Sequence, residues 1–183
     1  MNRLMLKDFH THNLLAEPGA AIINLPEEAL WFPGQFCMVE GALYSVGIHP
    51  WWTTGDWRSM WPAVEYWARH PQVVALGECG LDKLRGADIS EQRECFLRQV
   101  ELAEQCALPV TIHCVKAFDQ ILLLHKQVHP RMRWTIHGFR GKPQLARQLL
   151  SAGLNLSFGR RYNEESWNLT PPDLRYRETD DDW

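Results

Sequence analysis

Short apolar segments recur along the whole chain, and many of them are separated by segments in which apolar residues have helical spacing. The short segments are rich in Val, Ile and aromatic residues and are bordered by Gly or Pro, a pattern that favours strands. The eight predicted strands cover residues 4–12, 20–26, 43–50, 73–80, 109–114, 133–139, 154–159 and 174–180.

Helical spacing predicts four helices between these strands, over residues 57–70, 89–106, 118–129 and 142–153. Ser90, followed by Arg93 and Glu94, is an approximate capping signal for the second of them. Pro143 suits a first helical turn and Gly153 a C-terminal cap. The connections 13–19 and 27–42 are too short or too broken for full helices.

The alternation of strands and helices predicts an α/β fold, a reduced (β/α)8 TIM-like barrel that forms a single domain over residues 1–183. Full early helices and a helix after the eighth strand are missing, and such barrels usually need about 250 residues. The alternative is an open doubly wound sheet. That fold would lack its glycine-rich phosphate loop after the first strand.

The composition is that of a globular protein, with 45% apolar and 22% charged residues. No apolar run approaches the roughly 20 residues that span a bilayer, and the first residues do not resemble a secretory signal. A cytoplasmic location is therefore expected. The five cysteines form no C-x-x-C pair and are interpreted as reduced thiols. Cys114 follows His113, but an apolar setting raises a thiol pKa and argues against a nucleophile.

The net charge of −3 argues against a general nucleic-acid coat protein, which binds through many Lys and Arg residues. It leaves room for an enzyme with local positive charge. Seven basic residues lie in the loops after predicted strands four to seven: Lys83, Arg85, Lys116, Arg140, Lys142, Arg160 and Arg161. Together they would attract an anionic substrate, and ordinary solvated loop charge is the alternative. Trp51 and Trp52 could stack unpaired bases or simply pack.

Residues of metal-binding type stand at the ends of several predicted strands. His10 and His12 are two apart on the first strand, so both point to one side and could hold a metal ion. Glu78, His113, His137 and Asp180 end four further strands. A barrel gathers these strand ends at its catalytic face. Any one of them alone is more typical of a buried polar group, but together they predict one metal site.

These residues lie in blocks that resemble a known family. The blocks DFHTH, GECGLD, TIHCVKA, IHGFRG and ETD are similar, in order and spacing, to the signatures of the TatD-type metal-dependent deoxyribonucleases of the metal-dependent hydrolase superfamily. The resemblance covers residues 8–182. It implies a (β/α)8 barrel with two divalent cations.

The resemblance also implies roles for the site residues. His10 and His12 would bind the first metal with Asp180 beside it, His113 and His137 the second, and Glu78 would bridge the two ions. Asp180 would also act as general base. This donor set suits zinc, manganese or nickel better than calcium, and magnesium is a further candidate. Two such ions about 3.5–4 Å apart could stabilise the attacking and leaving oxygens of a phosphodiester.

Asp8 and Asp82 are interpreted as partners that orient the ligating imidazoles, with a turn or capping role as the alternative. His49, in GIHP, is followed by Trp51 and Trp52, although relatives often have a second histidine nearby. A structural role is therefore expected for His49, more than a substrate contact.

Family members usually continue past the ETD block into a final helix that covers strands eight and one, whereas this sequence ends at Trp183. The outer face near Leu4, Leu6 and Tyr176 is therefore expected to be exposed. An exposed apolar patch tends to find a partner or to aggregate, so self-association or marginal stability is expected.

The predicted function is phosphodiester hydrolysis by a two-metal deoxyribonuclease, with DNA as substrate and no membrane partner. One alternative is a hydrolase of the same superfamily that acts on a small amide, lactone or phosphate ester. Many of those enzymes use a carbamylated bridging lysine, which has no counterpart here because strand four ends in Glu78. The other alternative is a truncated, inactive remnant.

Overall fold

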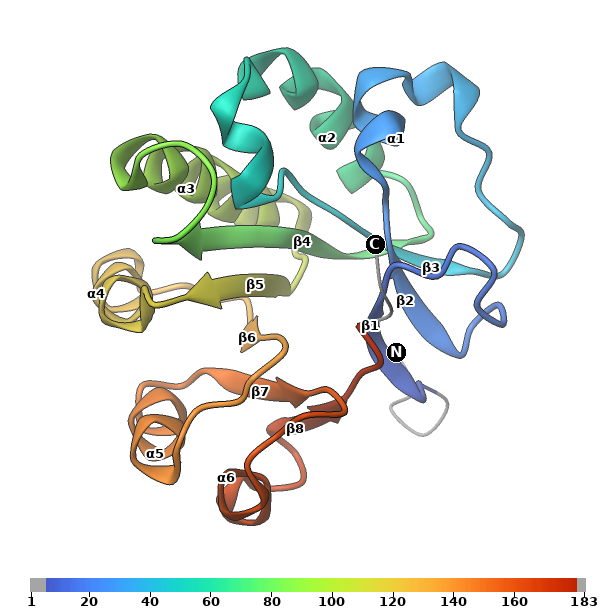
Figure 1. Cartoon of the computed structure of the whole chain (residues 1–183). Coiled ribbons are helices and arrows are strands. Elements are labelled where there is room, and N and C mark those ends of the chain that lie inside the picture. The colour runs from blue at the N-terminus through green and yellow to red at the C-terminus, as the bar shows by residue number, and fades with distance from the viewer. Residues whose placement is uncertain (1–5, 181–183) are drawn as a thin grey trace.

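A computed structural model describes residues 6–180 and contains one sheet of eight parallel strands in sequence order (Figure 1). The strands are β1 (Asp8–Thr11), β2 (Ala21–Asn24), β3 (Leu43–Val46), β4 (Val73–Asp82), β5 (Val110–Val115), β6 (Trp134–Ile136), β7 (Asn155–Phe158) and β8 (Arg175–Arg177). Each falls within or overlaps one predicted segment. The reduced TIM-like barrel is thus confirmed.

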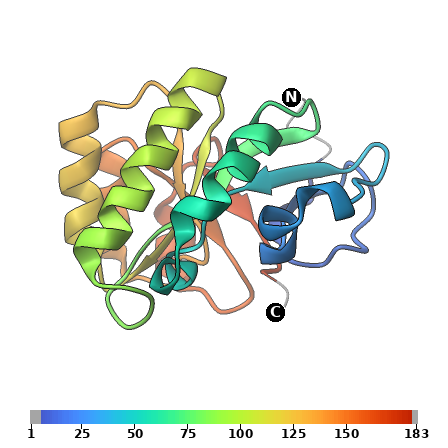
Figure 2. The same ribbon diagram turned by 90° about the horizontal axis from the view of Figure 1, so that it is seen from above.

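Helices follow most strands and cover the outside of the sheet. They are α1 (Glu27–Trp31), α2 (Trp61–Ala68), α3 (Ile89–Cys106), α4 (Phe118–Val128), α5 (Pro143–Ser151) and α6 (Glu164–Leu169), with 3-10 turns η1 (Pro33–Gln35), η2 (Pro50–Thr54) and η3 (Trp57–Met60). Figure 2 shows α2, α3 and α4 side by side on one flank of the strands. Among the described helices, none combines the length and apolar character needed to cross a bilayer.

All four predicted helices are present. The one predicted over 57–70 is divided into the 3-10 turn η3 and α2, which ends at Ala68, and the cap of α3 differs from the prediction. Asp88, rather than Ser90, caps α3, because its carboxylate accepts hydrogen bonds from the backbone N–H groups of Ser90 and Glu91. Ser90 already lies in the first turn, where its hydroxyl donates to Asp88. Pro143 begins α5 and Gly153 follows its C-cap with a φ of +92°, as predicted.

Two short helices were not predicted. Five-residue α1 lies in the connection judged too broken for a full helix, and six-residue α6 lies between β7 and β8. Neither is long enough to display helical periodicity. The capping residue of α6 is Asn163, whose side chain accepts from the backbone N–H of Ser166.

The barrel closes where β1 meets the residues after β8. The backbone N–H of Asp180 donates to the carbonyl of His10 at 3.1 Å. The Asp8 carboxylate accepts from the backbone N–H of Thr179 at 2.9 Å and from its hydroxyl at 2.6 Å. This closure places Asp180 at the same end of the barrel as His10.

The seam between β1 and β8 is less exposed than expected. Leu6 and Tyr176 are half-buried, and the Tyr176 ring stacks on buried Phe9 with centroids 4.4 Å apart. The Tyr176 hydroxyl also accepts a hydrogen bond from Asn155. Leu4 lies outside the described residues. Self-association through this seam stays a prediction.

Candidate metal centre

Glu78 lies at the centre of a cluster of imidazoles at the carboxyl end of the barrel. Its side chain is only 2% exposed, and five histidines bring a ring nitrogen close to its carboxylate. Oε1 lies 2.7 Å from His113 Nδ1, 2.7 Å from His137 Nε2 and 3.1 Å from His49 Nε2, and Oε2 lies 3.1 Å from His10 Nε2 and 3.4 Å from His12 Nε2.

Asp180 completes the group at its open side. Its Oδ1 is 3.8 Å from the Nε2 atoms of both His10 and His12, and its side chain is 27% exposed. All six sequence-predicted residues therefore converge on one place: His10, His12, Glu78, His113, His137 and Asp180. Their roles as metal ligands stay predictions.

Three overlapping trios in this group present ligand atoms within 4.8 Å of one another. They are His10 with His12 and Glu78, His10 with His137 and Asp180, and His49 with Glu78 and His113. The arrangement has the imidazole and carboxylate donors that could hold a divalent metal ion.

Two glycines allow β4 and β5 to approach closely beside the cluster. Gly77 and Gly80 have φ values of +136° and +148°, which only glycine adopts readily. A Cβ at Gly80 would collide with the backbone carbonyl oxygen of His113, and one at Gly77 with that of Thr111. This close approach brings Glu78 and His113 face to face.

Asn24 supports Glu78 from the end of β2, and the sequence analysis missed it. The backbone N–H of Glu78 donates to Asn24 Oδ1 at 2.7 Å, and the Ser45 hydroxyl donates to the same oxygen at 3.1 Å. The available signal was position, because Asn24 ends a predicted strand as the ligand candidates do.

Asp82 and Asp8 were both interpreted as carboxylates that orient the ligating imidazoles, but only Asp82 contacts one. Asp82 Oδ2 lies 3.2 Å from His113 Nε2, which leaves His113 Nδ1 facing Glu78. Asp8 instead contacts the backbone N–H groups of His10 and Thr179 and the Thr179 hydroxyl. The imidazole-orienting interpretation of Asp8 is therefore corrected. Its carboxylate binds the nearby backbone N–H of His10, as in the turn or capping alternative, and also binds distant Thr179.

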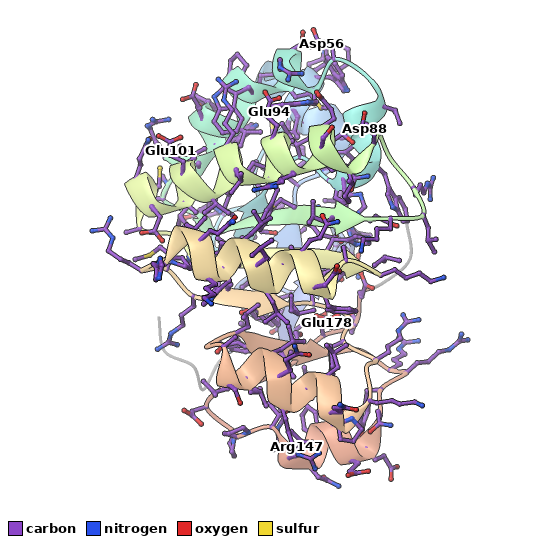
Figure 3. The ribbon with its side chains drawn as sticks, turned by 90° about the vertical axis from the view of Figure 1, so that its left-hand side faces the viewer. Asp56, Asp88, Glu94, Glu101, Arg147 and Glu178 are labelled. Atoms are coloured by element: carbon purple, nitrogen blue, oxygen red, sulfur yellow. The ribbon has the colours of Figure 1, made fainter. Side chains whose placement is uncertain are left out.

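Glu178 is a further carboxylate that the sequence analysis missed. It is buried inside the barrel, where Figure 3 labels it. Its Oε1 lies 3.5 Å from His137 Nδ1 and also accepts from the backbone N–H of Gly138. These contacts direct His137 Nε2 toward Glu78. Its place two residues before Asp180 on one extended segment was the signal, since such residues point to the same side.

His49 belongs to the cluster, although only a structural role was expected for it. Its Nδ1 accepts a hydrogen bond from the backbone N–H of Trp51 at 3.2 Å. A neutral imidazole with an accepting Nδ1 carries its proton on Nε2. Burial lowers the pKa of His49 to about 4, although Glu78 opposes the shift. Neutral His49 therefore donates from Nε2 to Glu78.

The cluster contains buried negative charge that a metal cation could neutralise. Burial alone would raise the pKa of Glu78, but His137, His49 and the other imidazoles hold it well below its usual range. Burial would lower the pKa of His137, yet Glu78 and Glu178 together raise it well above its ordinary value. In the metal-free site, a proton on His137 thus offsets two buried carboxylates. A divalent ion would supply that positive charge instead.

The Cys114 thiol is not part of this chemistry. Burial raises its pKa to about 12, so the reactive thiolate is scarce at neutral pH. The same cause raises the pKa of Cys95 to about 12 and raises that of Cys79 well above its ordinary value. Cys79 is buried, as expected, whereas Cys114 is half-buried.

Two cavities open on either side of the cluster. One of about 300 Å³ is lined by Asp180, Glu178, Arg140, Arg160 and Arg161 among others. The other, of about 850 Å³, is lined by His12, Asn24, Trp51, Trp52 and Arg85 among others. The first combines three cationic side chains with the exposed edge of the site, which suits an anionic group.

The remaining predicted surface residues differ in their availability to a substrate. Lys83 forms an ion pair with Asp119 at 3.0 Å. The Arg85 guanidinium lies over the Trp51 ring, 3.7 Å from its centroid. Because that face of Trp51 is covered, base stacking on it is not supported. Lys116 and Lys142 are exposed.

Comparison with known sequences gives matches to TatD-type proteins. The family profile described as TatD related DNase matches residues 38–172. A 3′-5′ ssDNA/RNA exonuclease TatD from Klebsiella pneumoniae (strain 342) is 37% identical over 120 residues, which are 62% of this chain and 44% of that protein. Another from Pantoea sp. (strain At-9b) is 31% identical over 170 residues, 85% of this chain and 61% of that protein.

Solved structures show the same fold. A TatD homologue from Escherichia coli K12 has a TM-score of 0.76 at 22% identity, covering 96% of this chain and 79% of its own. A TatD family hydrolase from Entamoeba histolytica has a TM-score of 0.69 at 19% identity, and the match covers 96% of this chain and 74% of that one. The matched region spans less than two thirds of the length of the first curated relatives, 44%, 45% and 58% for three of them.

Proposed function

We propose that this chain, which belongs to the TatD-related DNase family, is a metal-dependent hydrolase that cleaves phosphodiester bonds in single-stranded nucleic acid. The observation that carries the proposal is the enclosure of Glu78 by five imidazole nitrogens within 3.4 Å. The curated relatives are named as 3′-5′ ssDNA/RNA exonucleases, which motivates the choice of substrate and of a 3′ end.

The residues fit divalent metal ions on physical grounds. An ionised carboxylate offers about four lone-pair sites, whereas five ring nitrogens surround that of Glu78. Among the described residues, His10 also leaves its buried ring Nδ1 without a hydrogen bond. Imidazole and carboxylate donors at this density suit zinc, manganese or nickel. Magnesium fits less well because it prefers oxygen ligands.

The ligand assignment that the distances favour divides the cluster into two halves. His10 and His12, both facing Glu78 Oε2, would hold one ion with Asp180 beside it. His113 and His137, both facing Glu78 Oε1, would hold the other. His49 would stay outside the ligand set, because its Nε2 carries a proton. Glu78 would bridge the two ions.

The chemistry follows from the chain's own residues. When bound, divalent ions would supply Lewis acidity toward the phosphoryl oxygens. Asp180, the exposed carboxylate of the site, would orient the attacking water and accept its proton. A new oxygen–phosphorus bond forms as the bond to the leaving oxygen breaks. The proton then passes to the leaving oxygen, which yields a phosphate monoester and an alcohol.

The substrate would enter with its phosphate toward the cavity beside Asp180. Arg140, Arg160 and Arg161 line that cavity, and their guanidinium groups match phosphate geometry. On the opposite side of the cluster, Trp52 lines a larger cavity that also holds Glu27 and Glu28. Those carboxylates would repel phosphate and leave this cavity to unpaired bases.

The test combines metal analysis with a nuclease assay. The purified protein is analysed for bound metal and then incubated with a single-stranded oligonucleotide labelled at its 5′ end, with and without added Zn²⁺ or Mn²⁺. Metal-dependent shortening one nucleotide at a time from the 3′ end is expected. The matched control is Glu78→Gln, which should bind less metal and show no shortening.

Two outcomes would contradict the proposal. Shortening that persists at full rate in the presence of a chelator would remove the metal centre from the reaction. A metal-loaded protein that leaves the oligonucleotide intact but hydrolyses a small phosphate ester would favour the small-molecule alternative.

A further inference from the structure

The cavity beside Asp180 is distinguished by the positive charge on its wall. It has a volume of about 300 Å³ and is lined by the side chains of Arg140, Arg160 and Arg161 and by the carboxylates of Glu178 and Asp180. Arg140 follows β6 and the other two arginines follow β7, which is paired with β6, so neighbouring loops bring them together. The cavity therefore joins a cationic wall to the exposed edge of the metal centre.

The two carboxylates of this cavity contact imidazoles of the cluster. Asp180 Oδ1 lies 3.8 Å from His10 Nε2, and Glu178 Oε1 lies 3.5 Å from His137 Nδ1. In the described part of the chain, neither carboxylate forms an ion pair with an arginine. The positive charge of the arginines is therefore not neutralised from the side of the metal centre.

Arg140 and Arg161 are exposed at the rim of the cavity. Among the residues that the structure describes, neither is paired with a carboxylate. A guanidinium group is always charged and presents five N–H donors in a planar fork, which matches the oxygens of a phosphate bidentately. The rim of the cavity therefore suits an anion that offers several acceptor oxygens.

Two glycines keep the space between the arginines and the carboxylates open. Gly138 and Gly159 both line the cavity. A Cβ at Gly138 would lie 3.6 Å from Glu178 Oε1 and 4.0 Å from Asp180 Oδ2, and one at Gly159 would lie 3.9 Å from Glu178. A side chain at either position would thus occupy space beside the carboxylates. Ligand pockets usually measure about 300–1,000 Å³, so this cavity suits one compact group.

A terminal phosphate matches the cavity better than a phosphate within a strand. A phosphodiester carries one negative charge, whereas a phosphate monoester carries about 1.5 to 2 at pH 7 and has three strong acceptor oxygens. Several guanidinium groups therefore match the monoester. Hydrolysis from a 3′ end also leaves only one nucleotide beyond the scissile phosphate. The one further phosphate that can lie on that side is therefore attached to the terminal 3′ oxygen.

We propose that Arg140, Arg160 and Arg161 bind a 3′-terminal phosphate, so that a nucleotide bearing this phosphate is removed in preference to one that ends in a 3′-hydroxyl. The inference rests on the proposed function, since it names the end of the strand on which the same site acts. It makes the three arginines determinants of substrate specificity.

The reaction at such an end balances without a further reactant. The water oxygen bonds to the scissile phosphorus, and the bond from that phosphorus to the 3′ oxygen of the preceding nucleotide breaks. That 3′ oxygen takes up a proton. The products are a nucleoside 3′,5′-bisphosphate and a strand that now ends in a 3′-hydroxyl. The preference therefore applies to the first cut, which converts a phosphate-blocked end into a hydroxyl end. A strand scission that leaves 3′-phosphates would supply the substrate.

The first measurement requires no cleavage. Thymidine 3′,5′-bisphosphate and thymidine 5′-monophosphate are titrated separately into the purified protein without added metal, and heat is recorded by calorimetry. The two ligands differ only in the 3′-phosphate. We expect the bisphosphate to bind about 10-fold more tightly or better, as hydrogen bonds between charged groups permit.

Variants identify the groups that cause this difference. Arg161→Gln and Arg140→Gln each remove one guanidinium from the rim and should bring the two Kd values closer together. The matched control is Arg147→Gln, because Arg147 is an exposed arginine of α5 whose charge faces Glu165 at 3.8 Å, outside the cavity. It should retain the native ratio of the two Kd values.

The second measurement is the rate of the first cut. An internally labelled single strand is prepared with a 3′-phosphate, with a 5′-phosphate or with neither, and cleavage is followed with added Mn²⁺. The form with the 3′-phosphate should have a KM about 10-fold lower than the other two, which should resemble each other. Arg161→Gln should reduce this advantage, and Arg147→Gln should not.

The outcomes separate this proposal from the proposed function. Equal Kd values for bisphosphate and monophosphate in the native protein would overturn the phosphate pocket, even if strands are cleaved. A preference for the 5′-phosphate form would overturn it as well, and so would a native Kd ratio in both Arg161→Gln and Arg140→Gln. A native protein that favours the bisphosphate but cuts no strand would support the pocket and contradict the proposed function.

Discussion

Glu78 and His49 lie 3.1 Å apart in the same buried cluster, but they make different contacts within it. Glu78 contacts every histidine of the cluster, whereas His49 donates a single proton into it. We predict that Glu78→Gln lowers kcat by more than about 100-fold, beyond the range for outer partners. His49→Ala should lower it by about 10-fold. Steady-state kinetics on a labelled single strand checks the order, and equal losses would contradict it.

Thiol reactivity offers a test of burial that does not depend on function. Burial raises the pKa of Cys95 and Cys114 to about 12, so at pH 8 their thiolate fraction is negligible and rises only toward the raised pKa. Cys37 is exposed, Cys106 and Cys114 are half-buried, and Cys79 and Cys95 are buried. We predict that a thiol reagent labels Cys37 first and Cys106 more slowly, with Cys79, Cys95 and Cys114 labelled only after denaturation. Mass spectrometry of the labelled peptides provides the check, and early labelling of Cys114 would refute the prediction.

Among the elements, α3 is the helix whose capping residue was misassigned from sequence, and its true cap can be tested. Asp88 accepts from the backbone N–H groups of Ser90 and Glu91. Loss of such a cap usually costs about 0.5–2 kcal/mol. We predict that Asp88→Ala lowers the free energy of unfolding by about 1 kcal/mol, measured by urea denaturation.

The control for this variant lies on the same helix. Glu101 is exposed farther along α3, away from Asp88 (Figure 3). Glu101→Ala removes a charge without removing a cap and replaces one good helix former by a better one. It should leave the stability unchanged within about 0.5 kcal/mol. An equal loss in both variants would show that charge, rather than capping, matters.

The helices also show which elements can be predicted from the spacing of apolar residues along the chain. The predicted helix over 89–106 coincides with α3 because 18 residues display full periodicity. The six residues of α6 do not. Asp88 was passed over in favour of Ser90 because both residue types cap helices, and only the observed backbone conformation distinguishes them.

For the whole molecule, closure of the barrel depends on a contact between residues 171 positions apart. Asp8 accepts two hydrogen bonds from Thr179, and an unsatisfied buried partner costs about 1–3 kcal/mol. We predict that Asp8→Ala lowers the free energy of unfolding by an amount in that range. Lys7→Ala is the control, since the exposed Lys7–Glu17 pair at 3.7 Å should contribute little. Similar stability of both variants would argue against closure through Asp8.

The distribution of charge over the molecule leads to a last prediction. Arg140 lines the cavity beside Asp180, whereas Arg147 lies on the outside of α5 and is exposed (Figure 3). A phosphate contact releases counterions, so Arg140→Ala should raise KM for single-stranded DNA and lower the salt slope of binding by about 1. Arg147→Ala should change neither. A titration of DNA binding against salt concentration distinguishes the two variants. An unchanged salt slope for Arg140→Ala would show that Arg140 does not contact a phosphate.

The sequence by itself determined the strand pattern, the barrel and the six residues that meet at its carboxyl end. These follow from local rules: apolar runs mark strands, residues two apart share a side, and parallel strands end together. No pairing between distant residues has to be known for such an inference. His10, His12, Glu78, His113, His137 and Asp180 could therefore all be named in advance.

Only the tertiary structure decided which neighbours hold those residues in place. His49 reaches Glu78 across 29 positions of sequence, Asp82 holds His113 across 31, and Glu178 approaches His137 from beyond two further strands. Likewise, Trp51 changed from a base-stacking candidate to a partner of Asp82 once Arg85 was seen over its ring. Strand alternation fixes the side to which a residue points, but the partner it meets depends on how distant strands align around the closed barrel.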